Sequence, residues 1–107
     1  MENYECTPAE LQEQMNSDNP PKLIDVREQS EWDIVHLEGG VLLTQPLMEE
    51  ITESWHRGSP IVFYCHHGVR SVQALLYLRQ HGFDNVRSMK GGIDAWAQKL
   101  DPGMTRY

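Results

Sequence analysis

Short apolar runs alternate with stretches of helical spacing along the chain, and this alternation limits the possible folds more than any other feature. The apolar runs are residues 23–26, 41–43, 61–64 and, more weakly, 85–89, and residues 4–6 form a short candidate strand before them. Apolar residues at helical spacing lie at 46–55, in the segment that starts at Arg70 and stops at Gly82, and at 93–100. Strands that alternate with helices predict an α/β domain with a mainly parallel sheet.

Two further helices are expected from their start signals. Thr7 precedes Pro8 and stands three residues before Glu10, which is the pattern of a capping box with proline in the first turn. A second, short helix is expected to begin with Ser30 as its cap, to turn Trp32, Val35 and His36 inward, and to end at residues 39–40.

Cys65 stands at a junction between a strand and a helix. The apolar run 61–64 leads into it, and a short loop follows before the helical segment at Arg70. The first N–H groups of a helix have no partner within the helix, and an anion such as a thiolate is stabilised against them. Gly68 supplies a position for a positive φ, and Arg70 can either close an anion site or pair with a carboxylate. The sequence therefore predicts a nucleophilic thiolate at Cys65.

Asp25 ends another candidate strand, as Cys65 does. The carboxyl ends of parallel strands meet at one edge of a sheet, where ligands of α/β proteins gather. We therefore expect Asp25 and Cys65 on the same edge, where Asp25 could act as a general base or hold neighbouring groups in place.

The spacing from cysteine to arginine separates two chemistries. Four residues lie between Cys65 and Arg70, one fewer than in the Cys-x5-Arg loop of cysteine-dependent phosphatases. A smaller ring of N–H groups suits one terminal sulfur better than a tetrahedral phosphate. The loop therefore favours a persulfide carrier over a phosphatase.

With this C-x-x-G-x-R-S loop the chain resembles the rhodanese (sulfurtransferase) family. Further matching segments are D-V-R at 25–27, E-W at 31–32, H-L-E-G-G at 36–40 and G-G-I-D-A-W at 91–96, so the resemblance covers most of residues 20–100. The last seven residues, 101–107, are also similar to the end of the rhodanese domain that is fused to some ubiquitin-activating-like adenylyltransferases.

The resemblance implies a rhodanese-like fold, with a mainly parallel five-stranded sheet and helices on both faces, and the length fits one domain over residues 1–107. It implies that Cys65 accepts a sulfane sulfur and passes it to a nucleophile. Loop residues expected to bind the persulfide or shape its site are His66, His67, Gly68, Val69, Arg70 and Ser71. Asp25 and Arg27 are expected to support the loop from behind.

Neither a metal nor an organic cofactor is expected. His66 and His67 are adjacent and have no third ligand at a metal-binding spacing, so a substrate-docking or electrostatic role fits them better. Cys6 is expected to be inert.

The composition limits the partners. The net charge of −7 and the absence of a basic stripe argue against nucleic acid or membrane surfaces. The first residues lack the basic and apolar regions of a signal peptide, so a cytoplasmic protein with a free Cys65 thiol is expected. The chain is expected to act as a monomer.

The sequence thus predicts a sulfurtransferase that moves sulfur from thiosulfate or a persulfide donor to cyanide or another thiol. A binding or regulatory module with the same fold, and a phosphatase or arsenate reductase, stay as alternatives.

Overall fold

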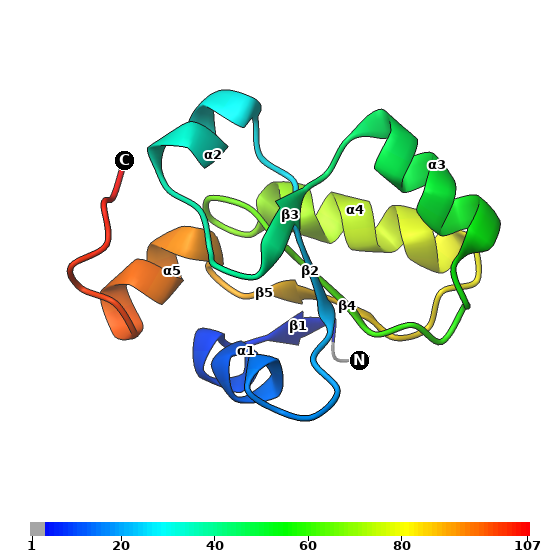
Figure 1. Ribbon diagram of the computed structural model, residues 1–107, viewed down its shortest axis with the longest axis horizontal. Helices are drawn as coiled ribbons and strands as arrows, with labels where there is room; N and C mark the ends of the chain where they lie inside the picture. Colours follow the sequence, from blue (N-terminus) through cyan, green and yellow to red (C-terminus); the bar gives the residue numbers. More distant parts are fainter. Residues whose placement is uncertain (1–3) are drawn as a thin grey trace.

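The computed structural model describes residues 4–107, which form five strands and five helices in alternation. The strands are β1 (Glu5–Cys6), β2 (Lys22–Asp25), β3 (Gly40–Leu42), β4 (Ile61–Tyr64) and β5 (Val86–Met89). The helices are α1 (Pro8–Met15), α2 (Gln29–Ile34), α3 (Gln45–Ser54), α4 (Val69–Gln80) and α5 (Gly92–Lys99). The expected α/β domain is confirmed (Figure 1).

The five strands form one sheet in the order β1-β5-β4-β2-β3, and every neighbouring pair is parallel. In the central pair of β2 and β4, Asp25 lies opposite Tyr64, the residue before Cys65. The sheet therefore brings Asp25 and Cys65 to the same edge, as their positions in the sequence predict.

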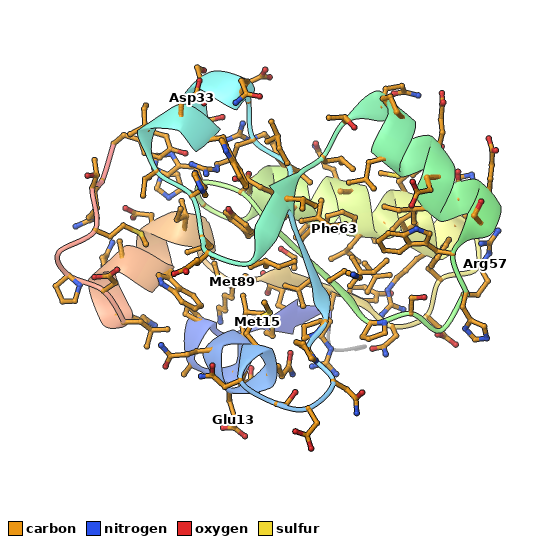
Figure 2. The ribbon with its side chains drawn as sticks, in the orientation of Figure 1. Glu13, Met15, Asp33, Arg57, Phe63 and Met89 are labelled. Carbon is orange, nitrogen blue, oxygen red and sulfur yellow. The ribbon has the colours of Figure 1, made fainter. Side chains whose placement is uncertain are left out.

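Successive strand residues point to opposite sides of the sheet, so both of its faces carry apolar side chains. Helices cover both faces. Phe63 and Met89 lie in the interior, whereas the charged Glu13 and Asp33 lie at the periphery (Figure 2). The core on one face is built around Val62 with residues of α1 and α5, namely Leu11 and Ile93. The core on the other face is built around Phe63 with residues of α3 and α4, namely Ile51, Leu75 and Leu78.

The starts of α1 and α4 follow the local signals in the sequence. The Glu10 N–H donates to the Thr7 hydroxyl at 3.1 Å and the Thr7 N–H donates to Glu10 Oε1 at 2.8 Å, so the expected capping box is confirmed. Gly68 caps α4 with a φ of 106°, a left-handed conformation that favours glycine. This turn starts the helix at Val69, directly after the loop.

The second helix differs from the expectation in three respects. It begins after Glu28 rather than after Ser30, it ends at Ile34 rather than at residues 39–40, and the His36 side chain is exposed. The Glu28 N–H donates to Glu31 Oε1 at 2.9 Å, which sets the start of the helix. His36 instead stacks flat on Trp32, with 3.8 Å between the ring centroids.

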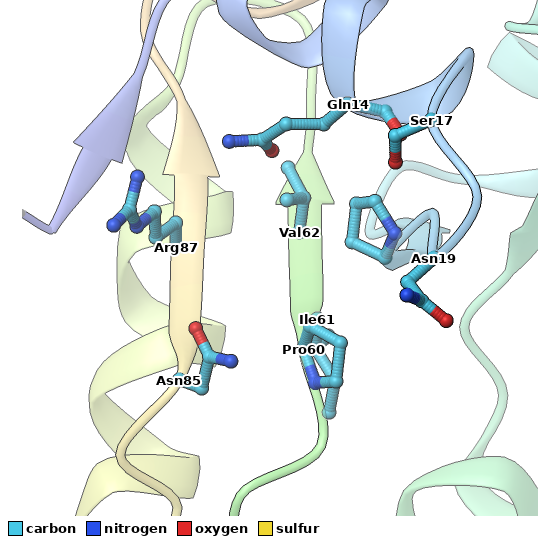
Figure 3. Close-up of a pocket in the computed structure, with 9 residues that line it drawn as sticks. Gln14, Ser17, Asn19, Pro60, Ile61, Val62, Asn85 and Arg87 are labelled. Atoms are coloured by element: carbon cyan, nitrogen blue, oxygen red, sulfur yellow. The ribbon is translucent and has the colours of Figure 1, made fainter.

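A hollow of about 210 Å³ lies at the other end of the strands, away from Cys65 (Figure 3). Gln14, Arg87 and residues at the starts of β4 and β5 line it. It therefore has no part in chemistry at the thiol. Within residues 4–107 none of the helices has the length and apolar character needed to cross a membrane.

Candidate active site

Cys65 lies directly after β4, and the segment that we name the cysteine loop, residues 65–71, turns from it into α4. The loop lies between α2 and α5, with the chain's last residues nearby (Figure 1). The Cys65 side chain is held within the loop, and the residue as a whole is 1% exposed. The thiol is therefore surrounded by backbone groups rather than by water.

Two N–H groups of the loop donate to the sulfur. The Gly68 N–H reaches Cys65 Sγ at 3.0 Å and the Ser71 N–H reaches it at 3.4 Å. The Ser71 hydroxyl lies 3.4 Å from the same sulfur and 2.6 Å from the hydroxyl of Ser88 on β5. Ser71 thus contacts the thiol with its hydroxyl and its N–H group, and α4 directs its first turn at the sulfur.

The start of α5 fixes the backbone of the cysteine loop from the other side. The Ile93 N–H donates to the Cys65 carbonyl at 2.8 Å and the Asp94 N–H donates to the His66 carbonyl at 3.2 Å. Gly92, between β5 and these donors, has a φ of +65°, and a Cβ atom there would overlap both carbonyl groups. The G-G-x-x-x-W segment therefore holds the loop, a role that the sequence did not reveal.

Replacing Gly92 by alanine is expected to displace the cysteine loop and to destabilise the protein by about 2 to 3 kcal/mol, since it combines left-handed strain with a backbone clash. Urea denaturation measures the loss, and thiol alkylation reports on the loop. Gly103→Ala is the matched control, because its Cβ atom would meet only a side-chain oxygen at 3.8 Å. Equal stability of the two variants would refute the anchoring role.

Arg70 pairs with a carboxylate, which is one of the two roles open to it. Its guanidinium donates to both oxygens of Glu31, at 2.7 Å and 3.0 Å. This bidentate hydrogen bond lowers the pKa of Glu31 to about 2, and the pairing raises the pKa of Arg70. The pair joins α2 to the first turn of α4 and so braces the cysteine loop from outside.

The Glu31 carboxylate is expected to make the free energy of unfolding depend on pH in the acid range. Because its pKa is lowered by folding, its contribution is complete above pH 4.5, the ordinary value, and is lost as the pH falls toward 2. Glu31→Gln should lose about 1 kcal/mol at pH 7, after allowance for solvent screening at the half-exposed Arg70.

This difference from the wild type should shrink between pH 4.5 and 2 in urea titrations at several pH values. Glu53→Gln, which changes an exposed carboxylate on α3, should follow the wild type throughout. A Glu31→Gln deficit of constant size across that range would contradict the assignment.

Asp25 and Arg27 form a fully buried ion pair, with both side chains 0% exposed. Arg27 Nη2 lies 2.6 Å from Asp25 Oδ2, and Arg27 Nε donates to both carboxylate oxygens. The Arg27 N–H donates to Asp25 Oδ1 at 2.9 Å, which shapes the turn after β2. Asp25 thus holds both the side chain and the backbone of Arg27.

Arg27 extends this pair toward the rim of the site. Its Nη1 donates to the Tyr107 hydroxyl at 2.6 Å and its Nη2 donates to the Val35 carbonyl at 2.7 Å. The Tyr107 hydroxyl in turn donates to Glu31 Oε2 at 2.9 Å. The two carboxylate–guanidinium pairs are therefore parts of one network.

His66 and His67 form part of a stack of rings beside the cysteine. The His66 ring stacks on His67 and on Tyr107, with 4.0 Å between centroids in each case. Burial lowers the pKa of His66, which favours its neutral form. His67 is largely exposed and lies 3.9 Å from Asp94, so its ring stands on the open rim.

The structure brings together most of the residues that the sequence singled out. Gly68 and Ser71 contact the sulfur, and Arg70 braces the loop, whereas Asp25 and Arg27 pair with each other and Arg27 reaches Glu31. Four residues were missed by sequence reasoning: Glu31, Ser88, Gly92 and Tyr107. Glu31 and Gly92 lie in the quoted motifs and Tyr107 lies in the matching segment 101–107, but Ser88 carries no local signal.

Within residues 4–107, no three or more His, Cys, Asp or Glu side chains are grouped so that they could hold a metal ion. Cys6 is buried far from solvent in the core beside β5, and burial raises its pKa to about 11. Its thiol therefore stays protonated at neutral pH.

Comparison with solved structures extends the likeness over the whole fold. Protein SSP1007 of Staphylococcus saprophyticus superposes with a TM-score of 0.75 at 26% identity, over 99% of this chain and 100% of that one. The human single-domain sulfurtransferase TSTD1 has a TM-score of 0.75 over 92% of this chain and 98% of its own, and at 21% identity it supports the fold alone.

Among curated proteins, the "Probable adenylyltransferase/sulfurtransferase MoeZ" of Mycobacterium tuberculosis (strain CDC 1551 / Oshkosh) is 39% identical over 103 residues. The match takes in 94% of this chain and 26% of MoeZ, so the chain spans about a quarter of that relative. The expected likeness to a domain of adenylyltransferases is thereby confirmed.

The model of the rhodanese-like domain family matches residues 7–99, which include β2, the cysteine loop and the start of α5. Sequence motifs, fold and family match agree, and the chain belongs to the rhodanese-like domain family.

Proposed function

We propose that this domain is a sulfurtransferase that carries sulfur as a persulfide on Cys65. The observation that supports this most directly is the pair of N–H groups, from Gly68 and Ser71, that donate to Cys65 Sγ. Donors held in place before the reaction stabilise negative charge on sulfur without a cost of reorganisation. An inert buried cysteine has no need of them.

The reaction consists of two displacements. The Cys65 thiolate attacks the outer, sulfane sulfur of thiosulfate, a new S–S bond forms, and the old S–S bond breaks as sulfite leaves with its electron pair. A thiol or cyanide then attacks the terminal sulfur of the persulfide, and the bond to Cys65 breaks to return the thiolate. With cyanide the product is thiocyanate. No redox cofactor enters this balance.

The terminal sulfur of the persulfide would extend beyond Sγ toward the mouth of the loop. Other backbone N–H groups of the loop, those of His66, His67 and Val69, are the candidate donors to it. Binding by backbone groups would leave the side chains of His66 and His67 free to contact the donor or acceptor.

The phosphatase alternative is disfavoured by the same geometry. The loop carries one residue fewer than phosphatase loops, and Arg70 is engaged by both oxygens of Glu31 rather than turned to an anion over Cys65. A binding module without chemistry is disfavoured because the thiol and its donors are all present. Activity on aryl phosphates would revive the first alternative, and a thiol that never takes up sulfur would revive the second.

The physiological partners are a separate part of the proposal. His67 is largely exposed and Val69 is 69% exposed, so the rim of the site is open. Such a rim can receive a protein that bears a persulfide or thiol at least as well as it can receive thiosulfate. The reducing cytoplasm would keep Cys65 free for either donor.

Mass spectrometry of the intact protein tests the proposed function. After incubation with thiosulfate and removal of excess reagent, the mass should rise by one sulfur atom, and cyanide should remove it with release of thiocyanate. The added sulfur should map to the peptide that contains Cys65. A protein whose mass stays unchanged with thiosulfate and with a small-molecule persulfide would refute the proposal.

A further inference from the structure

The last residues of the chain contact the cysteine loop directly at His66 and are linked to it at two further points, through Asp94 and through Glu31. Arg106 Nε donates to Asp94 Oδ1 at 2.9 Å, and the N–H of Asp94 holds the His66 carbonyl. The Tyr107 ring stacks on His66, nearly parallel at 9°. The Tyr107 hydroxyl lies between Arg27 and Glu31, accepting from the first and donating to the second.

The hydroxyl of Tyr107 connects two ion pairs that differ in character. One is the buried pair of Asp25 and Arg27, which is fixed to the end of β2. The other is the pair of Glu31 and Arg70, in which Arg70 is 41% exposed and belongs to the cysteine loop. The rigid pair can therefore hold the more exposed one in place through this hydroxyl.

The ring of Tyr107 acts on the loop by a second route. His66 follows Cys65 directly, and stacking on Tyr107 and His67 restricts the movement of its side chain. Surface loops are otherwise mobile, and ordering one residue costs about 1 to 2 kcal/mol of backbone entropy. A loop that is already ordered presents its N–H groups to the sulfur at no further cost.

We infer that Tyr107 is a positioning residue for sulfur transfer: it keeps the cysteine loop ordered through His66 and through the hydroxyl that joins Arg27 to Glu31. This inference rests on the proposed function and deepens it, because it names a residue outside the cysteine loop that acts on the same site. Tyr107 is 40% exposed, so its removal leaves the hydrophobic core intact.

Two substitutions separate the contributions of the ring and the hydroxyl. Tyr107→Phe keeps the stack on His66 and loses the hydrogen bonds to Arg27 and Glu31, whereas Tyr107→Ala loses the stack and both hydrogen bonds. We expect the rate of Cys65 persulfidation by thiosulfate to fall about 3-fold in the first and about 10-fold or more in the second. The loss should appear in kcat rather than in KM, since the role proposed for Tyr107 is to order the loop around the thiolate rather than to bind thiosulfate.

Alkylation of Cys65 by iodoacetamide, measured against pH in a Cys6→Ala background, gives a readout that does not depend on sulfur transfer. The rate rises as the thiolate forms, and a loosened loop stabilises the thiolate less. In Tyr107→Ala the alkylation rate at neutral pH should fall about 3-fold or more. Tyr77→Ala is the matched control, since Tyr77 is 45% exposed and lies beside His81 rather than the cysteine loop.

The outcomes separate the two proposals. If Tyr107→Ala and Tyr77→Ala have the same alkylation profile and the same kcat, Tyr107 has no positioning role. This holds even if the Tyr107→Ala substitution lowers the unfolding midpoint. If the wild type takes up no sulfur, the proposed function fails, and the alkylation profile alone then decides the role of Tyr107.

Discussion

Replacing Cys65 by serine is expected to reduce thiosulfate:cyanide turnover to background, a loss of at least about 10³-fold. A serine hydroxyl is a far weaker nucleophile than a thiolate at neutral pH. The measurement is the rate of thiocyanate formation at saturating thiosulfate. Residual turnover above a tenth of the wild-type value would contradict the mechanism.

The second cysteine supplies the control for this variant. Cys6 is 2% exposed in the core, and its pKa of about 11 keeps it as a thiol at neutral pH. Cys6→Ala should therefore keep its turnover per folded molecule while losing about 1 kcal/mol of stability through lost packing. Both variants should show the circular dichroism spectrum of the wild type, which separates loss of chemistry from loss of fold.

Removing the buried carboxylate at Asp25 is expected to cost about 3 to 5 kcal/mol of unfolding free energy. Asp25→Ala leaves the Arg27 guanidinium buried without its counter-charge and frees the turn after β2. Since small domains are stable by only about 5 to 15 kcal/mol, this is a large share of the total. Urea denaturation followed by tryptophan fluorescence measures the change.

Asp33→Ala provides the comparison for Asp25. Asp33 is exposed on α2, where it accepts from the side chain of Gln29 at 2.8 Å, and its loss should change stability by no more than about 0.5 kcal/mol. If both variants lost the same small amount, the pair of Asp25 and Arg27 would not hold the end of β2 in the way that its burial indicates.

The parts of the fold that depend on local pattern could be predicted from the sequence. The expected strand at residues 61–64 has the same bounds as β4, and the capping box at Thr7 and Glu10 starts α1. The second helix could not be predicted as well. Ser30 has the side chain of a typical cap, but Glu31 reaches back to the Glu28 N–H and also binds Arg70, so the helix starts earlier.

The candidate site divides in the same way. Cys65, Gly68 and Ser71 lie no more than six positions apart, so their proximity follows from a strand, a short loop and a helix in sequence. The contacts that brace this loop join residues that are distant in the sequence. Arg70 and Glu31 are 39 positions apart, and Arg27 and Tyr107 are 80 positions apart. A pattern of a few neighbouring residues does not predict which distant residue each of them binds.

The sequence by itself determined the alternation of strands and helices, the edge of the sheet at which Cys65 and Asp25 meet, and the spacing that sets this loop apart from a phosphatase loop. These follow from hydrophobic period, turn chemistry and residue count, which act over a few neighbouring residues. Only the tertiary structure decided that Arg70 binds Glu31, that Gly92 lies under the loop and that Tyr107 closes the network. Those contacts depend on how α2, α5 and the last residues pack around the sheet, and packing is a property of the whole chain.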